Sequence, residues 1–442
     1  MRKIILFIHG WSESSDCFKH AHEFLHSCFD LSKYQINFAD FITMDDSITF
    51  SDLVIAMQTA WKKHDLPLDG KHVDIITHST GALVLRAWLK MYFPNGGSPI
   101  RHLIMFAPPN FGSHLAHLGG EFYSRLYKGF NRKHPFEVGQ NLLNSLELGS
   151  NFLNELAEFD CFSDNTSFQV DDILTTVFIG SSGYNGLAAI ANVQASDGVV
   201  PIASTSLSPQ KLIINYDSND EVYVDLKTSK SMIAYKIFPY LNHSTILSTS
   251  FSNLKFRSYF RKALTVTSTE YEDYCANLAK ENKAYSRICK DLFLQQTIIK
   301  VKNQFNEPVP DYFLEFAADN CKNLSNMNSF HDDFLKNVHC NRHSPDIRVF
   351  TFDTDVLQPF YMNSRTKIDI SLTAMPSLEK SNASAGYISH DVINSKALIM
   401  QVSKLRHIFK PFSTLLIDWT INRELKSNIF TFHEDHSHGI SS

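Results

Sequence analysis

Four short apolar runs constrain the fold of this chain more than any other feature. Each run is apolar or β-branched along most of its length, rather than at every second position, which is typical of strands buried on both faces. Helical patterns separate the runs, one of them over Ser51–Lys63. Strands that alternate with helices predict a parallel sheet with helices on both faces. The four runs are Lys3–Ile8, Val73–Thr77, Leu103–Ala107 and Ile173–Ile179.

The length of 442 residues is long enough for two domains. We expect residues 1–265 to form the α/β domain. Within it, residues 110–172 predict an insertion of two or more amphipathic helices, which form either a lid or wall of a substrate pocket or ordinary core-packing helices.

Beyond about residue 265 the pattern changes. Thr269 and Glu272 resemble a capping box, which predicts a helix that runs to about Phe293. Alternation with period two follows, as in Lys367–Thr373, and a turn is expected at Asn306–Pro310. We therefore predict that residues 266–442 form a mainly antiparallel, sandwich-like accessory domain.

The charge balance excludes one class of partner. The chain has 41 Lys and Arg against 46 Asp and Glu, a net charge of -5, and no basic block. Electrostatic binding to nucleic acid is therefore not expected. Attraction to anionic lipid is also not expected, so membrane contact would depend on apolar and aromatic side chains. The chain has many aromatic side chains that could make such a contact: 35 Phe, 16 Tyr and 4 Trp.

No metal or disulfide framework is expected. The seven cysteines are odd in number, and no pair has the spacing of a zinc or thioredoxin motif. The His-containing segments 339–343 and 433–438 offer only weak metal interpretations. The apolar run at Ile4–Ile8 is too short for a signal peptide, and no stretch approaches the length of a membrane span.

The strongest chemical signal is a serine between a predicted strand and a predicted helix. Ser79 stands in a variant of the Gly-x-Ser-x-Gly nucleophile elbow, with threonine in place of the first glycine. Such a turn is tight and strained, and it lifts the serine hydroxyl above the sheet. A helix cap is the alternative interpretation of the pentapeptide alone. The elbow residues are Thr77, His78, Ser79, Thr80 and Gly81.

A catalytic serine needs a base and a carboxylate that orients the base, and on such a fold they follow the serine in the order acid, then histidine. His243 is the only histidine between His134 and His331, and it comes after a strand-like stretch. Asp197 lies in a loop, followed by glycine and two valines, beyond the strand that ends at Ile179. These two residues are the candidate base and acid. Alternatives for the acid are Asp171, Asp172, Asp217 and Asp225.

Acyl transfer also needs two N–H groups that stabilise an oxyanion. Trp11, in His9-Gly10-Trp11 at the end of the first predicted strand, is expected to supply one. Thr80, directly after the candidate nucleophile, is expected to supply the other. These parts predict an ester hydrolase that works through an acyl-enzyme and needs no metal or organic cofactor.

These motifs resemble those of the α/β-hydrolase lipases. The Thr-His-Ser-Thr-Gly elbow, the spacing of the candidate triad and the long C-terminal extension resemble most closely the PlaB-type bacterial phospholipases A. The motif resemblance covers about the first 265 residues. The segments that carry it are His9–Trp11, Thr77–Gly81, Ala107–Ser113, Ser196–Pro201 and Asn242–Ser244.

The resemblance implies a phospholipase A and lysophospholipase A with Ser79, Asp197 and His243 as the triad. It further implies a haemolytic, virulence-associated enzyme of Gram-negative bacteria that is associated with a membrane, at the outer membrane or cell surface, without an evident signal peptide. Phospholipids and lysophospholipids would be its substrates. It would assemble as a homo-oligomer, a dimer or tetramer, through the C-terminal domain.

Two other interpretations remain open from the residues. A carboxylesterase, thioesterase or acyltransferase would use the same fold and triad, because these do not fix the leaving group. A non-catalytic α/β-hydrolase scaffold is the interpretation from a different class, and the intact set of four matched parts argues against it.

Overall fold

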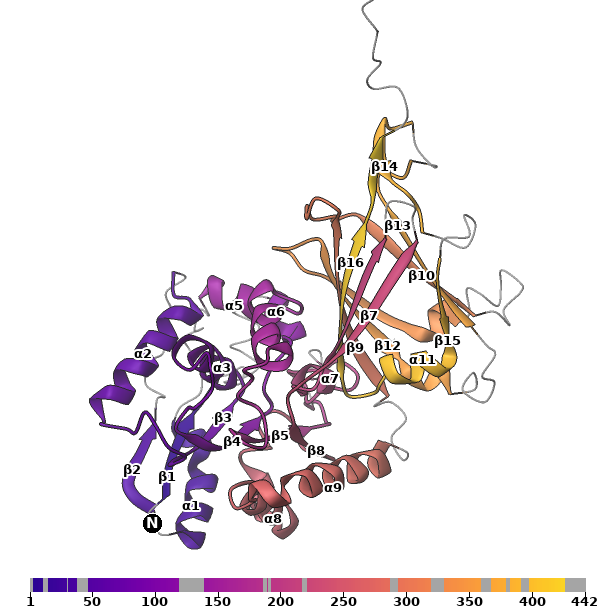
Figure 1. The fold of residues 1–442 in the computed structure, drawn as a ribbon. Coiled ribbons are helices and arrows are strands. Elements are labelled where there is room, and N and C mark those ends of the chain that lie inside the picture. Colours follow the sequence, from indigo (N-terminus) through magenta and orange to yellow (C-terminus); the bar gives the residue numbers. More distant parts are fainter. Residues whose placement is uncertain are drawn as a thin grey trace, which may run out of the picture.

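The structure is a computed structural model with two parts side by side (Figure 1). An α/β part contains most of the N-terminal residues, and a part made of β-sheets contains most of the C-terminal residues. The structure describes residues 3–10, 15–29, 31–37, 47–118, 139–185, 189, 192–216, 221–286, 293–318, 330–358, 367–378, 382–390 and 397–425.

The α/β part is built on a six-stranded sheet in the order β2-β1-β3-β4-β5-β8. All neighbouring strands in it are parallel. Each of the four apolar runs forms a strand, so the predicted parallel sheet is confirmed. The strands are β1 (Lys3–Ile8), β2 (Leu31–Asn37), β3 (Val73–His78), β4 (Ile100–Phe106), β5 (Leu174–Gly180) and β8 (Ile233–Phe238).

Helices cover both faces of this sheet. The apolar sides of α2 (Phe50–Lys63) and α3 (Gly81–Tyr92) pack on one face, through side chains such as Trp61 and Trp88. On the other face lie α1 (Lys19–Cys28), which follows the 3-10 turn η1 (Ser15–Phe18), and α8 (Leu254–Ala263). None of the helices in the described ranges is long and apolar enough to cross a membrane.

The segment between β4 and β5 contains the predicted short helices. They are η2 (His114–Leu118), α5 (Gln140–Leu146), α6 (Asn151–Ala157) and the π-helical turn η3 (Glu158–Phe162). Leu142, Leu146, Leu153 and Leu156 are buried in one cluster with Leu83 of α3. These helices therefore pack as core elements, whereas residues 119–138 of the predicted insertion lie outside the described residues.

The C-terminal part is a β-sandwich. A six-stranded sheet, β11-β12-β9-β16-β6-β7, faces a three-stranded antiparallel sheet, β10-β13-β15, and one apolar core contains residues of both. The large sheet is mixed, because β16 runs parallel to both β9 and β6. The strands are β6 (Gln210–Tyr216), β7 (Val222–Thr228), β9 (Leu294–Asn303), β10 (Tyr312–Ala318), β11 (Leu335–Cys340), β12 (Ile347–Asp353), β13 (Lys367–Ala374), β15 (Leu398–Gln401) and β16 (Thr414–Ile421).

The smaller elements close this part. They are η7 (Thr354–Leu357), α11 (Val402–Ile408) and a two-stranded sheet of β14 (Ala385–Tyr387) and β17 (Arg423–Leu425). The predicted sandwich is therefore confirmed in its architecture, and the expected turn at Asn306–Pro310 joins β9 to β10.

Chain segments cross the expected boundary at residue 265 in both directions. The hairpin β6–β7 precedes it but belongs to the large sheet of the sandwich, beside β16 (Figure 1). Helix α9 (Ser268–Ser286) follows it but packs on β8, where the Tyr271 hydroxyl accepts a hydrogen bond from the Ala234 N–H (3.1 Å). The predicted start of this helix was wrong: its capping pair is Thr267 and Glu270, because the chain turns helical at Ser268. Residues 287–292, over which the helix was expected to continue toward Phe293, lie outside the described residues.

The excess of aromatic residues is largely explained by the two cores. One face of the parallel sheet carries a cluster with Phe7, Phe18, Phe106, Phe178, Phe238, Phe251, Phe256 and Phe260. The sandwich core contains Phe316, Phe330, Phe334, Phe350, Phe352 and Phe409. Aromatic pairs of this kind stabilise a core beyond the area that they bury.

Candidate active site

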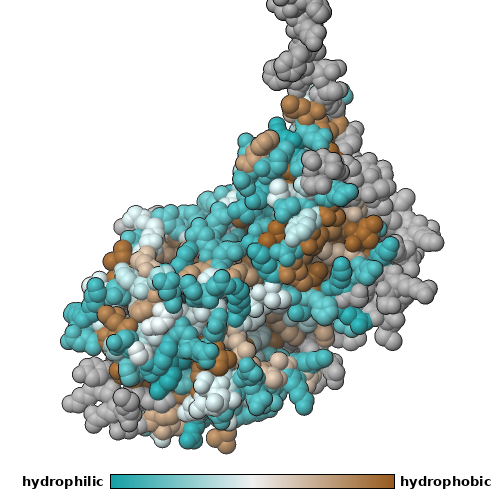
Figure 2. All heavy atoms as spheres, in the orientation of Figure 1, coloured by the Kyte–Doolittle hydropathy of each residue, from teal (hydrophilic) through white to brown (hydrophobic). Residues whose placement is uncertain are grey.

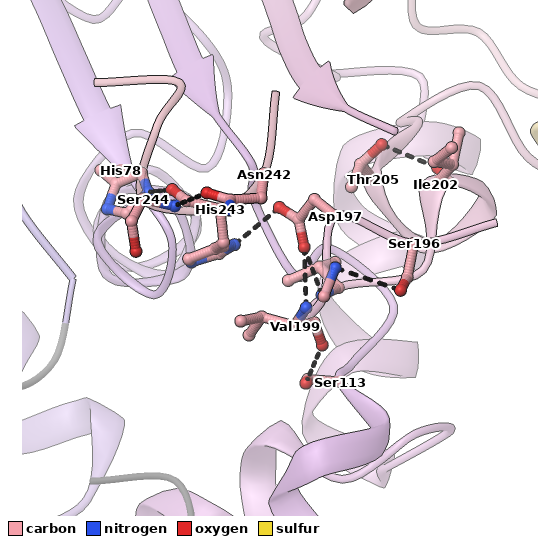
Figure 3. Close-up of polar contacts among 12 residues, drawn as sticks. His78, Ser113, Ser196, Asp197, Val199, Ile202, Thr205, Asn242, His243 and Ser244 are labelled. Carbon is pink, nitrogen blue, oxygen red and sulfur yellow. Dashed lines mark hydrogen bonds and ion pairs between the residues drawn. The ribbon is translucent and has the colours of Figure 1, made fainter. Parts of the chain in front are cut away.

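Asp197 and His243 meet in a buried contact (Figure 3). The Asp197 loop follows β5 in the chain, and His243 follows β8, the neighbouring strand. Nδ1 of His243 lies 2.7 Å from Oδ2 of Asp197, and both residues have an exposed fraction of 0%. Because a carboxylate can only accept, Nδ1 of His243 carries the proton. The His243 N–H also donates to the Asp197 carbonyl (3.0 Å), so backbone and side chain fix the pair together.

The second oxygen of Asp197 is held by its own loop. Oδ1 accepts hydrogen bonds from the N–H groups of Val199 (2.9 Å) and Val200 (2.7 Å). The turn that makes this possible needs Gly198, whose φ is +93°. The Ser113 hydroxyl donates to the Val199 carbonyl (2.6 Å) and so fixes the loop from outside. The carboxylate therefore has one fixed orientation, toward the imidazole.

Ser79 occupies the strained turn that its sequence predicts. Its φ is +51°, in the left-handed region that a residue with a side chain adopts only when its surroundings impose it. Its N–H donates to the Phe106 carbonyl at the end of β4 (2.9 Å). The turn thus lies where β3 ends and α3 begins, which is the geometry of a nucleophile elbow.

The end of β1 lies directly against the elbow. A methyl group placed on Gly10 would lie 2.7 Å from Cβ and 3.3 Å from Oγ of Ser79. A glycine is needed at this position because any side chain would displace the serine. The backbone of the His9-Gly10 turn is therefore adjacent to the serine side chain, which is the place from which an oxyanion-hole N–H must act.

We predict that Gly81→Ala destabilises the protein. A Cβ at Gly81 would lie 2.4 Å from the Ile8 carbonyl oxygen and 2.8 Å from that of His9, so the elbow and β1 would have to separate. Overpacking of this kind costs about 1–3 kcal/mol, and urea unfolding measures it. Gly97→Ala is the comparison, because a Cβ there meets nothing within 4 Å and its cost comes only from the positive φ of +76°. Equal losses in the two variants would contradict the close approach.

His78 connects the elbow to the base. Its Nε2 donates to the His243 carbonyl (3.1 Å), and the centroids of the two rings are 4.7 Å apart. Both rings are fully buried. Since His78 directly precedes Ser79, this contact brings the serine and His243 to the same edge of the sheet.

Of the other predicted site residues, the structure describes Thr77, Thr80 and His9 but not Trp11. Thr80 is buried at the start of α3, and Thr77, at the end of β3, donates weakly to the Ile104 carbonyl (3.5 Å). His9 Nδ1 contacts the Gly10 carbonyl (2.7 Å). Trp11, the expected second oxyanion donor, lies outside the described residues.

None of the alternative acids is placed near Ser79 in the described part of the chain. Asp171 and Asp172 precede β5, at the N-terminal edge of the sheet, and Asp172 pairs with Lys71. Asp225 lies on β7 in the sandwich. Asp217 is outside the described residues. The geometry favours Asp197 over these candidates.

Sequence reasoning missed the residues that support the acid loop from a distance. The Asn110 side chain donates to the Thr205 carbonyl (2.7 Å), and the Tyr235 hydroxyl donates to the Ile202 carbonyl (2.9 Å). Burial raises the pKa of Tyr235 and the nearby charge of Asp197 adds to this rise, although the hydrogen bond with Thr205 opposes both. Tyr235 therefore stays neutral and keeps its proton for donation. No local pattern marks these residues, because each contact joins segments far apart in the sequence.

No cluster of three or more metal-ligating side chains occurs among the residues that the structure describes. His339, from one of the weak metal motifs, instead contacts Glu147 (3.0 Å) across the two parts of the molecule. The other motif, residues 433–438, lies outside the described ranges.

Comparison with solved structures identifies the architecture. Phospholipase PlaB from Legionella pneumophila is similar over 99% of this chain and 97% of its own, with a TM-score of 0.85 and 20% sequence identity. The same protein in complex with thio-NAD is similar with a TM-score of 0.82 and 20% identity, over 98% and 97% of the two chains. No family model and no curated protein matches the sequence. The chain therefore has the PlaB-type fold, an α/β-hydrolase part combined with a C-terminal β-sandwich.

Proposed function

We propose that this protein is a serine lipolytic hydrolase, a phospholipase A and lysophospholipase A, with Ser79, Asp197 and His243 as its triad. The observation that carries the proposal is the buried Asp197–His243 pair, joined through His78 to a serine in a strained elbow. Buried polar groups cost stability, and strained serines occur where the strain serves a function. A pure scaffold would need neither.

In the proposed reaction, His243 removes the proton of the Ser79 hydroxyl as the oxygen attacks the ester carbonyl. Asp197 holds the imidazole so that its second nitrogen faces the serine, and it stabilises the imidazolium that forms. The oxyanion is stabilised by N–H groups, for which Thr80 and Trp11 are the proposed donors. His243 then gives the proton to the leaving alcohol. Water attacks the acyl-enzyme with the same histidine as base, and Ser79 is regenerated.

The proposed substrate class depends on the similarity to PlaB. That similarity extends over both parts of the chain, rather than over the hydrolase core alone. The Legionella pneumophila protein is a phospholipase, and we carry this activity over to the present chain as a proposal. Carboxylesterase, thioesterase and acyltransferase activities remain the alternatives that share the same chemistry.

A substrate panel tests the proposal. Diacyl phospholipids, lysophospholipids, short-chain esters and acyl thioesters are offered to the purified protein, and released fatty acid is measured against Ser79→Ala. We expect fatty acid from both phospholipid classes. Cleavage of short esters alone would overturn the phospholipase assignment, and the absence of any hydrolysis would overturn the hydrolase assignment.

We also propose that the protein acts at a membrane surface and as a homo-oligomer, a dimer or tetramer formed through the C-terminal part. Apolar side chains on the surface of the sandwich support this proposal. Val222, Val224 and Leu226 are exposed on β7, an edge strand of the large sheet, and Figure 2 shows hydrophobic residues gathered over the sandwich. Such patches mark surfaces that contact a partner or a lipid.

Two measurements test these proposals. With a net charge of -5, membrane attachment is expected to be insensitive to salt, which liposome binding at low and high salt measures. Sedimentation at several protein concentrations tests the oligomer, and a strictly monomeric protein would contradict it.

A further inference from the structure

The β-sandwich contacts the loop that carries Asp197. Thr414, the first residue of β16, donates from its hydroxyl to the Ala203 carbonyl (2.9 Å). Ala203 lies in the short helix α7 (Ile202–Thr205), which directly follows the Asp197 turn. Thr414 is 1% exposed, so water cannot replace this hydrogen bond. An unpaired carbonyl at this depth would destabilise the folded protein.

A second contact reaches the same loop through an intermediate segment. The Gln296 side chain on β9 donates to the Phe111 carbonyl (3.2 Å). The Phe111 N–H in turn donates to the Ser204 carbonyl (3.0 Å), and the Ser204 hydroxyl donates to the Gly112 carbonyl (2.6 Å). The segment held by Gln296 also contains Ser113, whose hydroxyl holds the Val199 carbonyl.

The chain itself adds a third connection. Shortly after α7 it enters β6, which pairs with β16 from Gln210 opposite Leu415. Gln210 is therefore held by its pairing with Leu415, the residue that directly follows Thr414. The Asp197 loop is fixed at one end by His243 and at the other by the large sheet of the sandwich, because β6 belongs to that sheet (Figure 1).

We propose that Thr414 and Gln296 are positioning residues for Asp197, and that the sandwich serves catalysis by holding the acid loop in register with His243. This inference rests on the proposed hydrolase function. The N–H groups of Val199 and Val200 orient the carboxylate, so a shift of their loop turns Asp197 away from the imidazole. A misplacement of about 1 Å in a catalytic group can cost about 100-fold in rate.

Two variants that keep side-chain size test the inference in the full-length protein. Thr414→Val removes the hydroxyl donor, and Gln296→Met removes the amide donor. We expect each to lower kcat by about tenfold, and the double variant to lower it further, with KM nearly unchanged because neither residue is placed at the substrate. The proton NMR signal of the His243 Nδ1–H, which lies far downfield while the contact with Asp197 is intact, should weaken or broaden in both.

Matched controls separate positioning from general stability. Gln295→Met removes a buried donor whose two contacts, with the Ile408 carbonyl (2.8 Å) and the Ser413 hydroxyl (3.5 Å), both stay within the C-terminal part. Thr420→Val makes the same change as Thr414→Val farther along β16. Both controls are expected to keep kcat and the downfield signal, even where the unfolding midpoint falls. Equal loss of kcat in test and control variants at matched stability would overturn the inference, as would full kcat in the double variant.

The result also separates this inference from the proposed function. If the wild type hydrolyses lipid and Ser79→Ala does not, the proposed function stands. If the Thr414 and Gln296 variants then keep the wild-type kcat, only the proposed role of the sandwich is overturned. If the wild type has no hydrolase activity, the proposed function fails. The downfield proton signal then still reports whether the sandwich positions Asp197.

Discussion

Ser79→Ala is expected to reduce kcat on the best lipid substrate by about 10⁴- to 10⁶-fold, the range found when the nucleophile of a serine hydrolase is removed. The hydroxyl is the only part of the elbow that forms a covalent bond to the substrate in the proposed mechanism. Alanine keeps the Cβ that lies against Gly10 and accepts the backbone strain as well as serine does. The measurement is released fatty acid in steady state, with circular dichroism to verify the fold.

Ser98→Ala is the matched control for this result. Ser98 has an exposed fraction of 0%, and its hydroxyl has no hydrogen-bond partner in the described structure. It lies just before β4, at the opposite edge of the sheet from Ser79. We expect unchanged activity in this variant. Retention of more than about one percent of kcat by Ser79→Ala would be incompatible with a nucleophilic role.

Arg86→Met is expected to cost about 3–5 kcal/mol of stability, because it leaves a buried carboxylate without its partner. Arg86 on α3 and Asp160 are 0% and 1% exposed, with Nε and Oδ2 2.6 Å apart. The arginine also donates to the Asn110 carbonyl (2.9 Å), so it joins α3 to the segment that supports the acid loop. Urea unfolding monitored by fluorescence measures the loss.

The pH dependence of this loss identifies its cause. Burial raises the pKa of the Asp160 carboxyl from 3.8 to about 6, although Arg86 opposes the rise. The unfolded chain therefore releases this proton before the folded protein does, and the carboxyl lowers stability as pH rises from about 4 to about 6. Without Arg86 the pKa of Asp160 in the folded protein rises further. The stability lost in Arg86→Met should therefore be larger at pH 8 than at pH 5.

Replacing both members of the pair provides the control. Arg86→Met combined with Asp160→Leu removes both charges, and apolar replacements of buried pairs are often nearly neutral. We expect the double variant to be more stable than Arg86→Met alone. A deficit that is the same at pH 5 and pH 8 would show that the charge of Asp160 is not its cause.

The sequence allowed good predictions for most features that depend on local patterns. The strand ends at Ile8 and near Thr77 follow from apolar runs, and the φ of Ser79 follows from the elbow motif. The chain order of acid and histidine pointed to Asp197 and His243, which the fold brings to 2.7 Å.

Most of the failures concern contacts between distant segments, and one concerns a local cap. The hairpin β6–β7 contains apolar strands that would suit either part of the molecule, and only tertiary pairing with β16 decides its sheet. The roles of Ser113, Asn110 and Gln296 could not be predicted, because each donates to a carbonyl that the fold alone places within reach. The cap of α9 was misplaced by two residues, since Thr269 and Thr267 offer the same side-chain chemistry.

We propose that Ser79, activated by His243 and Asp197, is the nucleophile of a hydrolase. A fluorophosphonate probe tests this role directly. The serine oxygen, whose proton passes to His243, attacks the phosphorus and displaces fluoride, and the stable phosphonyl group that remains on the serine is located by mass spectrometry. We predict one adduct in the wild-type protein, on the peptide that contains Ser79. The adduct should be absent in Ser79→Ala and form far more slowly in His243→Ala. An active enzyme that carries no adduct, or carries it on another residue, would contradict the account.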